Sequence, residues 1–98
     1  MEIWKQVKGY EGYYEVSDLG NIKSVRANIL LSQHIKDNGY KKVTFKVNGK
    51  QKSHNVHRLV AETFLPNPND YKYVNHKDEN KLNNRSDNLE WCSAKNDK

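Results

Sequence analysis

Residues 71–92 read YKYVNHKDENKLNNRSDNLEWC, the pattern of two short strands separated by a long polar loop. Residues 71–75 favour a strand that leads into His76, because aromatic and β-branched side chains are frequent there. Residues 77–88 are polar and rich in Asn, and residues 89–92 form the second strand. Ser93 can cap a helix that follows it. The sequence therefore predicts a strand, a loop, a strand and a helix at this end of the chain.

Side chains that can bind a metal ion or a proton lie at both ends of this unit. Asn75 and His76 close the first strand, and Asn96 and Asp97 lie in the first turn of the helix. These ends can meet if the hairpin packs on the helix. Mg²⁺ prefers oxygen ligands, so a carboxylate, an amide oxygen and a substrate phosphate form a suitable set. A neighbouring imidazole, with an ordinary pKa of about 6.5, could take a proton from an attacking water.

A hairpin and one further strand are predicted in the first 35 residues of the chain. Residues 13–25 form a hairpin around a turn at residues 18–21, because Asp, Gly and Asn supply the turn and β-favouring residues flank it. Residues 29–35 are apolar enough to form one further strand.

Residues 40–47 alternate between apolar and polar side chains, which predicts a strand with an apolar face at Val43 and Phe45. The Asn48-Gly49 pair predicts a tight hairpin turn. On the return strand, His54 and Val56 join the apolar face, and the opposite face is polar and basic. Residues 57–64 then form a short helix, which ends before the prolines that follow. His57 is expected to pack or cap at the start of this helix.

The positive charge of the chain is concentrated in its middle. The formal net charge is +5, and the segment from Lys23 to Arg58 holds nine Lys or Arg residues against one acid, Asp37. Such an excess suits a polyanion, either DNA or RNA. A solvated basic face without a partner is the alternative interpretation.

The composition fits one small folded domain. Only 35% of the 98 residues are hydrophobic, which leaves disorder as an alternative, but six Tyr, two Phe and two Trp favour a folded core. The single cysteine, Cys92, excludes an intrachain disulfide and suits a reducing compartment. No apolar run approaches the roughly 20 residues of a membrane span, so we expect no membrane partner.

Residues 74–84 and 87–93, which read VNHKDENKLNN and DNLEWCS, closely resemble the HNH (His-Me finger) motif of phage and intron homing endonucleases. Residues 56–68, VHRLVAETFLPNP, resemble the helix and loop that precede this motif. Residues 3–7, 9–17 and 20–24 resemble the modular N-terminal segment found ahead of such nucleases. The three matches occur in the expected order.

This resemblance implies a role for each matched position. His76 matches the general base that activates water for attack on the scissile phosphate, and Asn75 matches the metal ligand before it. Asn88 matches the central Asn, whose amide holds the loop so that the histidine points correctly. The last position of the motif, six residues after its tryptophan, is Asp97, where Asn or His is usual. Asp97 would be the second metal ligand, with Asn96 as the alternative if the helix shifts by one residue.

The resemblance further implies a metal-dependent endonuclease that nicks or cuts double-stranded DNA by phosphodiester hydrolysis, with Mg²⁺ or Mn²⁺ as cofactor. We expect a monomer or weak dimer in the cytoplasm of a phage or bacterial host cell. The residues expected to contact DNA are Lys42, Lys46 and Arg58 in the basic region and Lys77, Lys81 and Arg85 in or beside the loop.

The predicted fold is α+β, with an N-terminal antiparallel β-sheet, a linking helix and a C-terminal ββα-metal finger. Residues 1–55 would form the β-rich DNA-binding region and residues 56–98 the nuclease motif, packed as one unit. Two other functions stay open: an inactive DNA-binding relative, and an RNA-binding or ribosome-associated protein. Homing relatives often carry a DNA-reading segment after the finger, so the chain could also be a fragment.

Overall fold

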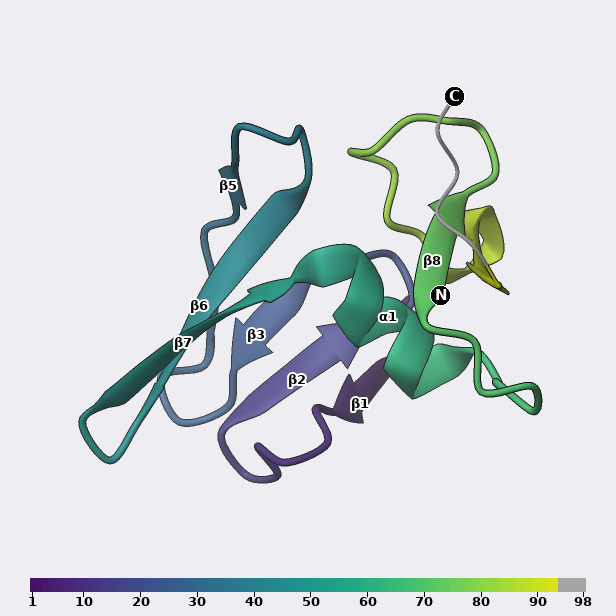
Figure 1. Cartoon of the computed structure of the whole chain (residues 1–98). Coiled ribbons are helices and arrows are strands. Elements are labelled where there is room, and N and C mark those ends of the chain that lie inside the picture. Colours follow the sequence, from purple (N-terminus) through teal and green to yellow (C-terminus); the bar gives the residue numbers. More distant parts are fainter. Residues whose placement is uncertain (94–98) are drawn as a thin grey trace.

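The described part of the chain consists of three small antiparallel sheets around one α-helix (Figure 1). The structure, a computed structural model, describes residues 1–93. The sheets have the orders β1-β2-β3-β4, β5-β6-β7 and β8-β9, which confirms the α+β class. The elements are β1 (Trp4–Gln6), β2 (Tyr14–Ser17), β3 (Ile22–Ser24), β4 (Ile29–Leu30), β5 (His34–Ile35), β6 (Lys41–Val47), β7 (Lys50–Asn55), α1 (Val56–Phe64), β8 (Tyr73–His76), the 3-10 helix η1 (Ser86–Asn88) and β9 (Leu89–Cys92).

The hairpin predicted in the N-terminal part is confirmed as β2 and β3. Its turn is closed by the Ser17 hydroxyl, which accepts hydrogen bonds from the backbone N–H groups of Leu19 at 3.2 Å and Asn21 at 3.1 Å. β1 pairs with the other edge of β2. The sequence did not predict β1, because a strand of three residues is too short to show a periodic pattern.

The single strand predicted over residues 29–35 is wrong. The chain forms β4 at the edge of the first sheet and β5 at the edge of the second. Leu31, just after β4, still donates its backbone N–H to the Ile22 carbonyl at 2.9 Å. The run is divided because it serves two sheets in turn, and an apolar pattern does not reveal the partner of each residue.

The tight turn predicted at Asn48-Gly49 is confirmed. Val47 pairs with Lys50, which leaves a two-residue turn. Asn48 and Gly49 have φ angles of 53° and 79°. Positive φ at both positions is what a type I′ turn requires, and this turn matches the twist of the flanking strands.

The two faces of this hairpin are also as predicted. Val43 and Phe45 are buried, whereas Thr44 and Lys46 are exposed. The predicted place of Val56 at the end of the return strand is wrong, because β7 ends one residue earlier and Val56 begins α1. From the first turn of the helix its side chain still reaches the core, where it is fully buried.

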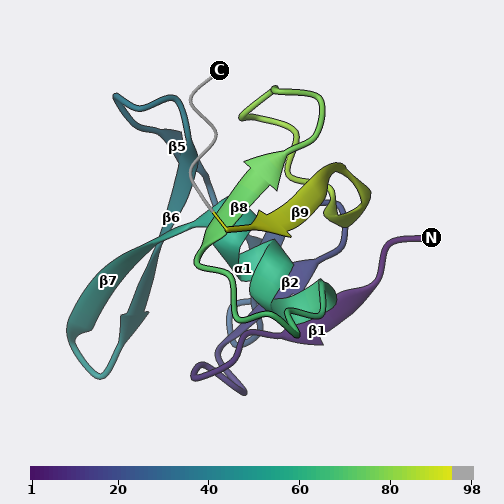
Figure 2. The same ribbon diagram turned by 45° about the vertical axis from the view of Figure 1, so that its right-hand side comes forward.

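The helix α1 lies between the first sheet and the β8–β9 hairpin (Figure 2). One apolar cluster joins all three sheets and the helix, which explains how such short elements are stabilised together. Within residues 1–93 no helix has the length and apolar character needed to cross a bilayer. The buried members of the cluster are Val7, Tyr14, Val16, Ile22, Val43, Phe45, Val56, Leu59, Val60 and Leu89.

The β2–β3 turn supports the loop between β8 and β9. Ser86 donates its backbone N–H to the Asp18 carbonyl at 2.8 Å. Gly20 has a φ of +90°, and a Cβ placed there would lie 3.0 Å from the carbonyl oxygen of Asn84. Backbone therefore approaches backbone at this point, and a side chain on residue 20 would push the loop away.

We expect Gly20→Ala to destabilise the protein more than the matched change Gly49→Ala. Both glycines have positive φ, so each alanine costs about 1 kcal/mol of backbone strain. Gly49 has nothing within 4 Å of its added Cβ, whereas Gly20 meets the Asn84 backbone, which adds about 1–3 kcal/mol of overpacking. Urea unfolding measures both losses. Equal losses in the two variants would contradict the close contact.

Candidate active site

Asn75 and His76 are the last two residues of β8, as predicted. In the β8–β9 ladder Asn75 pairs with Glu90 and His76 with Leu89. Strand side chains alternate between faces, so His76 turns toward the core and is 5% exposed, while Asn75 lies on the other face. The Asn75 amide nitrogen donates to a Glu90 carboxylate oxygen at 2.8 Å. This bond orients the amide and points its oxygen away from Glu90.

His76 is anchored by Asn84, a residue to which the sequence assigned no role. Nε2 of His76 lies 2.7 Å from Oδ1 of Asn84, and both side chains are buried. An amide oxygen only accepts hydrogen bonds, so Nε2 carries the proton and Nδ1 of the neutral ring is unprotonated. The ring therefore presents Nδ1 as its basic atom. The only sequence signal was the run of Asn in the loop, which did not distinguish Asn84 from its neighbours.

Asn88 closes the loop between β8 and β9. Its side-chain nitrogen donates to Asp78 Oδ1 and to the Asn83 carbonyl, both at 2.9 Å. Its side-chain oxygen accepts the Asp78 backbone N–H at 3.2 Å, and its carbonyl accepts the Lys77 N–H at 2.8 Å. Hydrogen bonds from Asn83, from the Asn80 backbone and from Asn88 lower the pKa of the Asp78 carboxyl, which keeps it charged as an acceptor. These bonds have the geometry expected of a residue that holds the loop.

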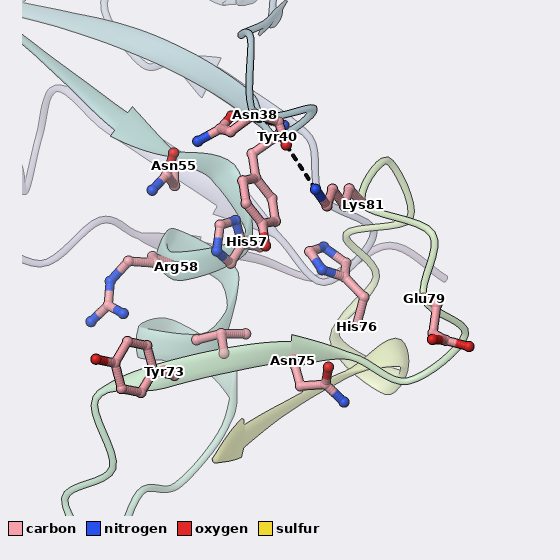
Figure 3. Close-up of a pocket in the computed structure, with 11 residues that line it drawn as sticks. Asn38, Tyr40, Asn55, His57, Arg58, Tyr73, Asn75, His76, Glu79 and Lys81 are labelled. Atoms are coloured by element: carbon pink, nitrogen blue, oxygen red, sulfur yellow. Dashed lines mark hydrogen bonds between the residues drawn. The ribbon is translucent and has the colours of Figure 1, made fainter. Parts of the chain in front are cut away.

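A cleft of about 290 Å³ opens beside His76 (Figure 3). Its lining comes from the β5–β6 turn, the β7–α1 junction, β8 and the following loop. The cleft is thus built from residues on both sides of position 55, the boundary expected between binding and nuclease regions. The lining residues are Asn38, Tyr40, Asn55, His57, Arg58, Tyr73, Val74, Asn75, His76, Glu79 and Lys81.

His57 packs at the start of α1 and also lines this cleft. It is 7% exposed, and its ring centroid lies 5.2 Å from that of His76. Burial first, and then Coulombic interactions with His76 and Arg58, lower the pKa of His57 to about 4. The imidazole of His57 is therefore neutral at physiological pH.

Two of the cations expected to contact DNA already bind acceptors within the protein. Arg58 donates to the Lys72 carbonyl at 2.7 Å and lies 5.5 Å from the centre of the Trp91 ring. Lys81 donates to the Asn38 carbonyl at 2.8 Å. Both side chains thereby connect segments that are distant in the sequence.

The other expected contacts differ in exposure. Arg85 forms hydrogen bonds of 3.2 Å with the Asp87 carboxylate, which raises the pKa of Arg85 and lowers that of Asp87. Lys46 on the polar face of β6 and Lys77 in the loop are exposed, and Lys42 is half-buried. Lys46 and Lys77 therefore offer ammonium groups at the surface.

The predicted metal ligands are described only in part. Asp97 and its alternative Asn96 lie outside the described residues. Within residues 1–93 no three His, Cys, Asp or Glu side chains gather into a group that could hold an ion. The amide oxygen of Asn75, oriented by the bond from its nitrogen to Glu90, is a ligand of the kind Mg²⁺ and Mn²⁺ prefer.

Protonation of His57 is expected to destabilise the fold at acid pH. Its pKa is about 4 in the folded protein against 6.5 for an exposed histidine, so between these values only the unfolded chain binds the proton. The stabilisation is complete above pH 6.5 and is lost as the pH falls toward 4, by about 3 kcal/mol. Urea unfolding over this range measures the loss. His57→Phe keeps a flat ring and should flatten the curve; an unchanged curve would assign the effect to another group.

Family models match the chain in two parts: residues 2–46 match the NUMOD4 motif, and residues 54–98 match the HNH endonuclease family. The chain is 42% identical over 92 residues to DNA endonuclease I-HmuI of Bacillus phage SP01, covering 94% of this chain and 53% of that protein. It is 41% identical over 91 residues to H-N-H endonuclease F-TflII of Escherichia phage T5, covering 91% of this chain and 47% of that protein.

A solved structure titled "DNA binding and cleavage by the HNH homing endonuclease I-HmuI" matches this fold with a TM-score of 0.86 and 42% identity. The match covers 92% of this chain and 52% of the other. The chain spans about half the length of these relatives. The resemblance to phage HNH homing endonucleases is thereby confirmed: residues 54–98 match the HNH endonuclease family, and residues 2–46 ahead of them match the NUMOD4 motif.

Proposed function

We propose that this chain is a metal-dependent endonuclease that hydrolyses phosphodiester bonds of double-stranded DNA. The observation that carries the proposal is the geometry of His76, whose ring donates through Nε2 to Asn84 and so has a basic Nδ1 beside the cleft. I-HmuI, which is similar over almost the whole chain, is by its title an enzyme that binds and cleaves DNA.

In the proposed reaction, His76 accepts a proton at Nδ1 from a water molecule, whose oxygen attacks the phosphorus as the bond to the leaving 3′ oxygen breaks. The Asn84 oxygen stabilises the resulting imidazolium, because it accepts the hydrogen bond from Nε2–H in both states of the ring. Asn88 holds the loop that carries Asn84. Asn75, together with Asp97, would hold Mg²⁺ or Mn²⁺, which when bound supplies positive charge that stabilises the phosphate in the transition state.

The polar face of the β6–β7 hairpin is the proposed surface for the DNA backbone. Thr44, Lys46 and Ser53 are exposed on it, and Thr44 pairs with Ser53 across the strands. Hydroxyl and ammonium groups are suited to phosphate contacts, which orient a duplex without reading its sequence.

One site per monomer favours a nick in one strand over a double-strand cut.

Plasmid nicking tests the assignment of His76. With Mg²⁺ or Mn²⁺ present, His76→Ala should lower the nicking rate by about 10²- to 10⁴-fold, because the general base is lost. A matched change, His34→Ala in the exposed strand β5, should leave the rate unchanged. Removal of the metal with EDTA should stop the reaction, and added Mg²⁺ should restore it. Equal nicking by wild type and His76→Ala would refute the nuclease proposal.

The salt dependence of duplex binding tests the hairpin surface. Lys42→Gln and Lys46→Gln should each reduce the slope of log K against log salt concentration by about 0.9, the value for one phosphate contact. Lys8→Gln, in the β1–β2 connection, is the matched control and should not change it. Slopes unchanged in both hairpin variants would exclude this surface. A salt-sensitive preference for single-stranded RNA would instead support the RNA-binding alternative.

A further inference from the structure

Three aromatic rings from separate parts of the chain meet in the cleft (Figure 3). The Tyr40 centroid lies 4.7 Å from that of His57 and 5.9 Å from that of His76, with interplanar angles of 28° and 23°. The centroids of the two histidine rings are 5.2 Å apart. Tyr40 therefore lies nearly parallel to both imidazoles, and each ring is within contact distance of the other two.

The loop after β8 holds the Tyr40 ring in this place. The ammonium of Lys81 lies 4.8 Å from the centre of the Tyr40 ring and donates to the Asn38 carbonyl at 2.8 Å. Gly39 packs against the same side chain, since a Cβ there would lie 3.2 Å from Cδ of Lys81. The segment before β6 is thus attached to the loop that contains Asn84.

His57 lines the same cleft and contacts both other rings as a neutral group. Nδ1 of His57 is buried and has no hydrogen-bond partner among the described residues. A charged imidazolium there would lack solvation, which agrees with the low pKa of this residue. The ring can therefore pack against His76 without charge repulsion.

The hydrogen bond to Asn84 restrains His76 at one atom only. A ring held at Cβ and at Nε2 can still tilt, and a tilt would move Nδ1 relative to the phosphate. Catalytic groups need their orientation held within about 10–20°, by side chains that are themselves locked by packing. The rings of Tyr40 and His57, which are themselves held in place by other contacts, meet this need.

We propose that Tyr40, contributed by the N-terminal segment, is a positioning residue whose ring, together with His57, fixes the imidazole plane of His76. This inference rests on the proposed function, because a fixed orientation of His76 matters only if His76 acts as a general base. The ring of Tyr40 acts, and its hydroxyl is not required. The cleavage site is then incomplete without the part of the chain that matches the NUMOD4 motif.

The test compares Tyr40→Phe, which keeps the ring, with Tyr40→Leu, which removes it. We expect Tyr40→Leu to lower kcat by about 10- to 100-fold with little change in KM, since misplacement of a catalytic group acts on the chemical step. Tyr40→Phe should restore kcat to within a few-fold of wild type. Tyr71→Leu, outside this cleft, is the matched control and should behave as wild type. Urea unfolding identifies any variant that has lost its fold.

A second readout does not depend on cleavage. NOEs from the imidazole protons of His76 to neighbouring side chains report the orientation of its ring, and the wild-type pattern should persist in Tyr40→Phe and be lost in Tyr40→Leu. If the wild type cuts no DNA, the nuclease proposal fails and these spectra still test the positioning role. Equal kcat and equal spectra in folded Tyr40→Leu would overturn the inference, as would a loss in Tyr40→Phe as large as that in Tyr40→Leu.

Discussion

The site depends on one buried hydrogen bond, from Nε2–H of His76 to Oδ1 of Asn84. If it broke, a donor and an acceptor would remain buried without partners, at a cost of about 1–3 kcal/mol. The bond decides which imidazole nitrogen is basic, and it joins the end of β8 to the middle of the following loop. The loop bonds centred on Asn88 keep Asn84 within reach. The conformation of the loop therefore determines which nitrogen of His76 is basic.

The N-terminal sheets contribute to this arrangement directly. Gly20 in the β2–β3 turn contacts the backbone of Asn84, and Tyr40 lies against His76. A single apolar cluster connects the same elements to α1 and to Leu89 beside the site. The two sequence matches, residues 2–46 and 54–98, thus describe segments that share a core and a cleft.

Contacts within the protein also change what the basic residues can do. Arg58, Lys81 and Arg85 were expected to contact phosphates, yet each bonds to a carbonyl or carboxylate of the protein. A cationic side chain that must first release an acceptor in the protein gains less binding free energy from a phosphate than a side chain that is solvated by water. The exposed Lys46 and Lys77 do not carry this cost in the same way, because their side chains extend into solvent.

Local sequence determined the β6–β7 hairpin, its Asn48-Gly49 turn and the place of His76 at the end of a strand. Alternation, positive φ and strand length act between near neighbours, so these features can be predicted without a fold. Only the tertiary structure decided that residues 29–35 divide between two sheets, that Asn84 anchors His76 and that Tyr40 covers it. These outcomes depend on contacts such as that of Lys81 with Asn38, 43 residues apart. No periodic pattern records such a contact, because its geometry exists only once the sheets have packed on the helix.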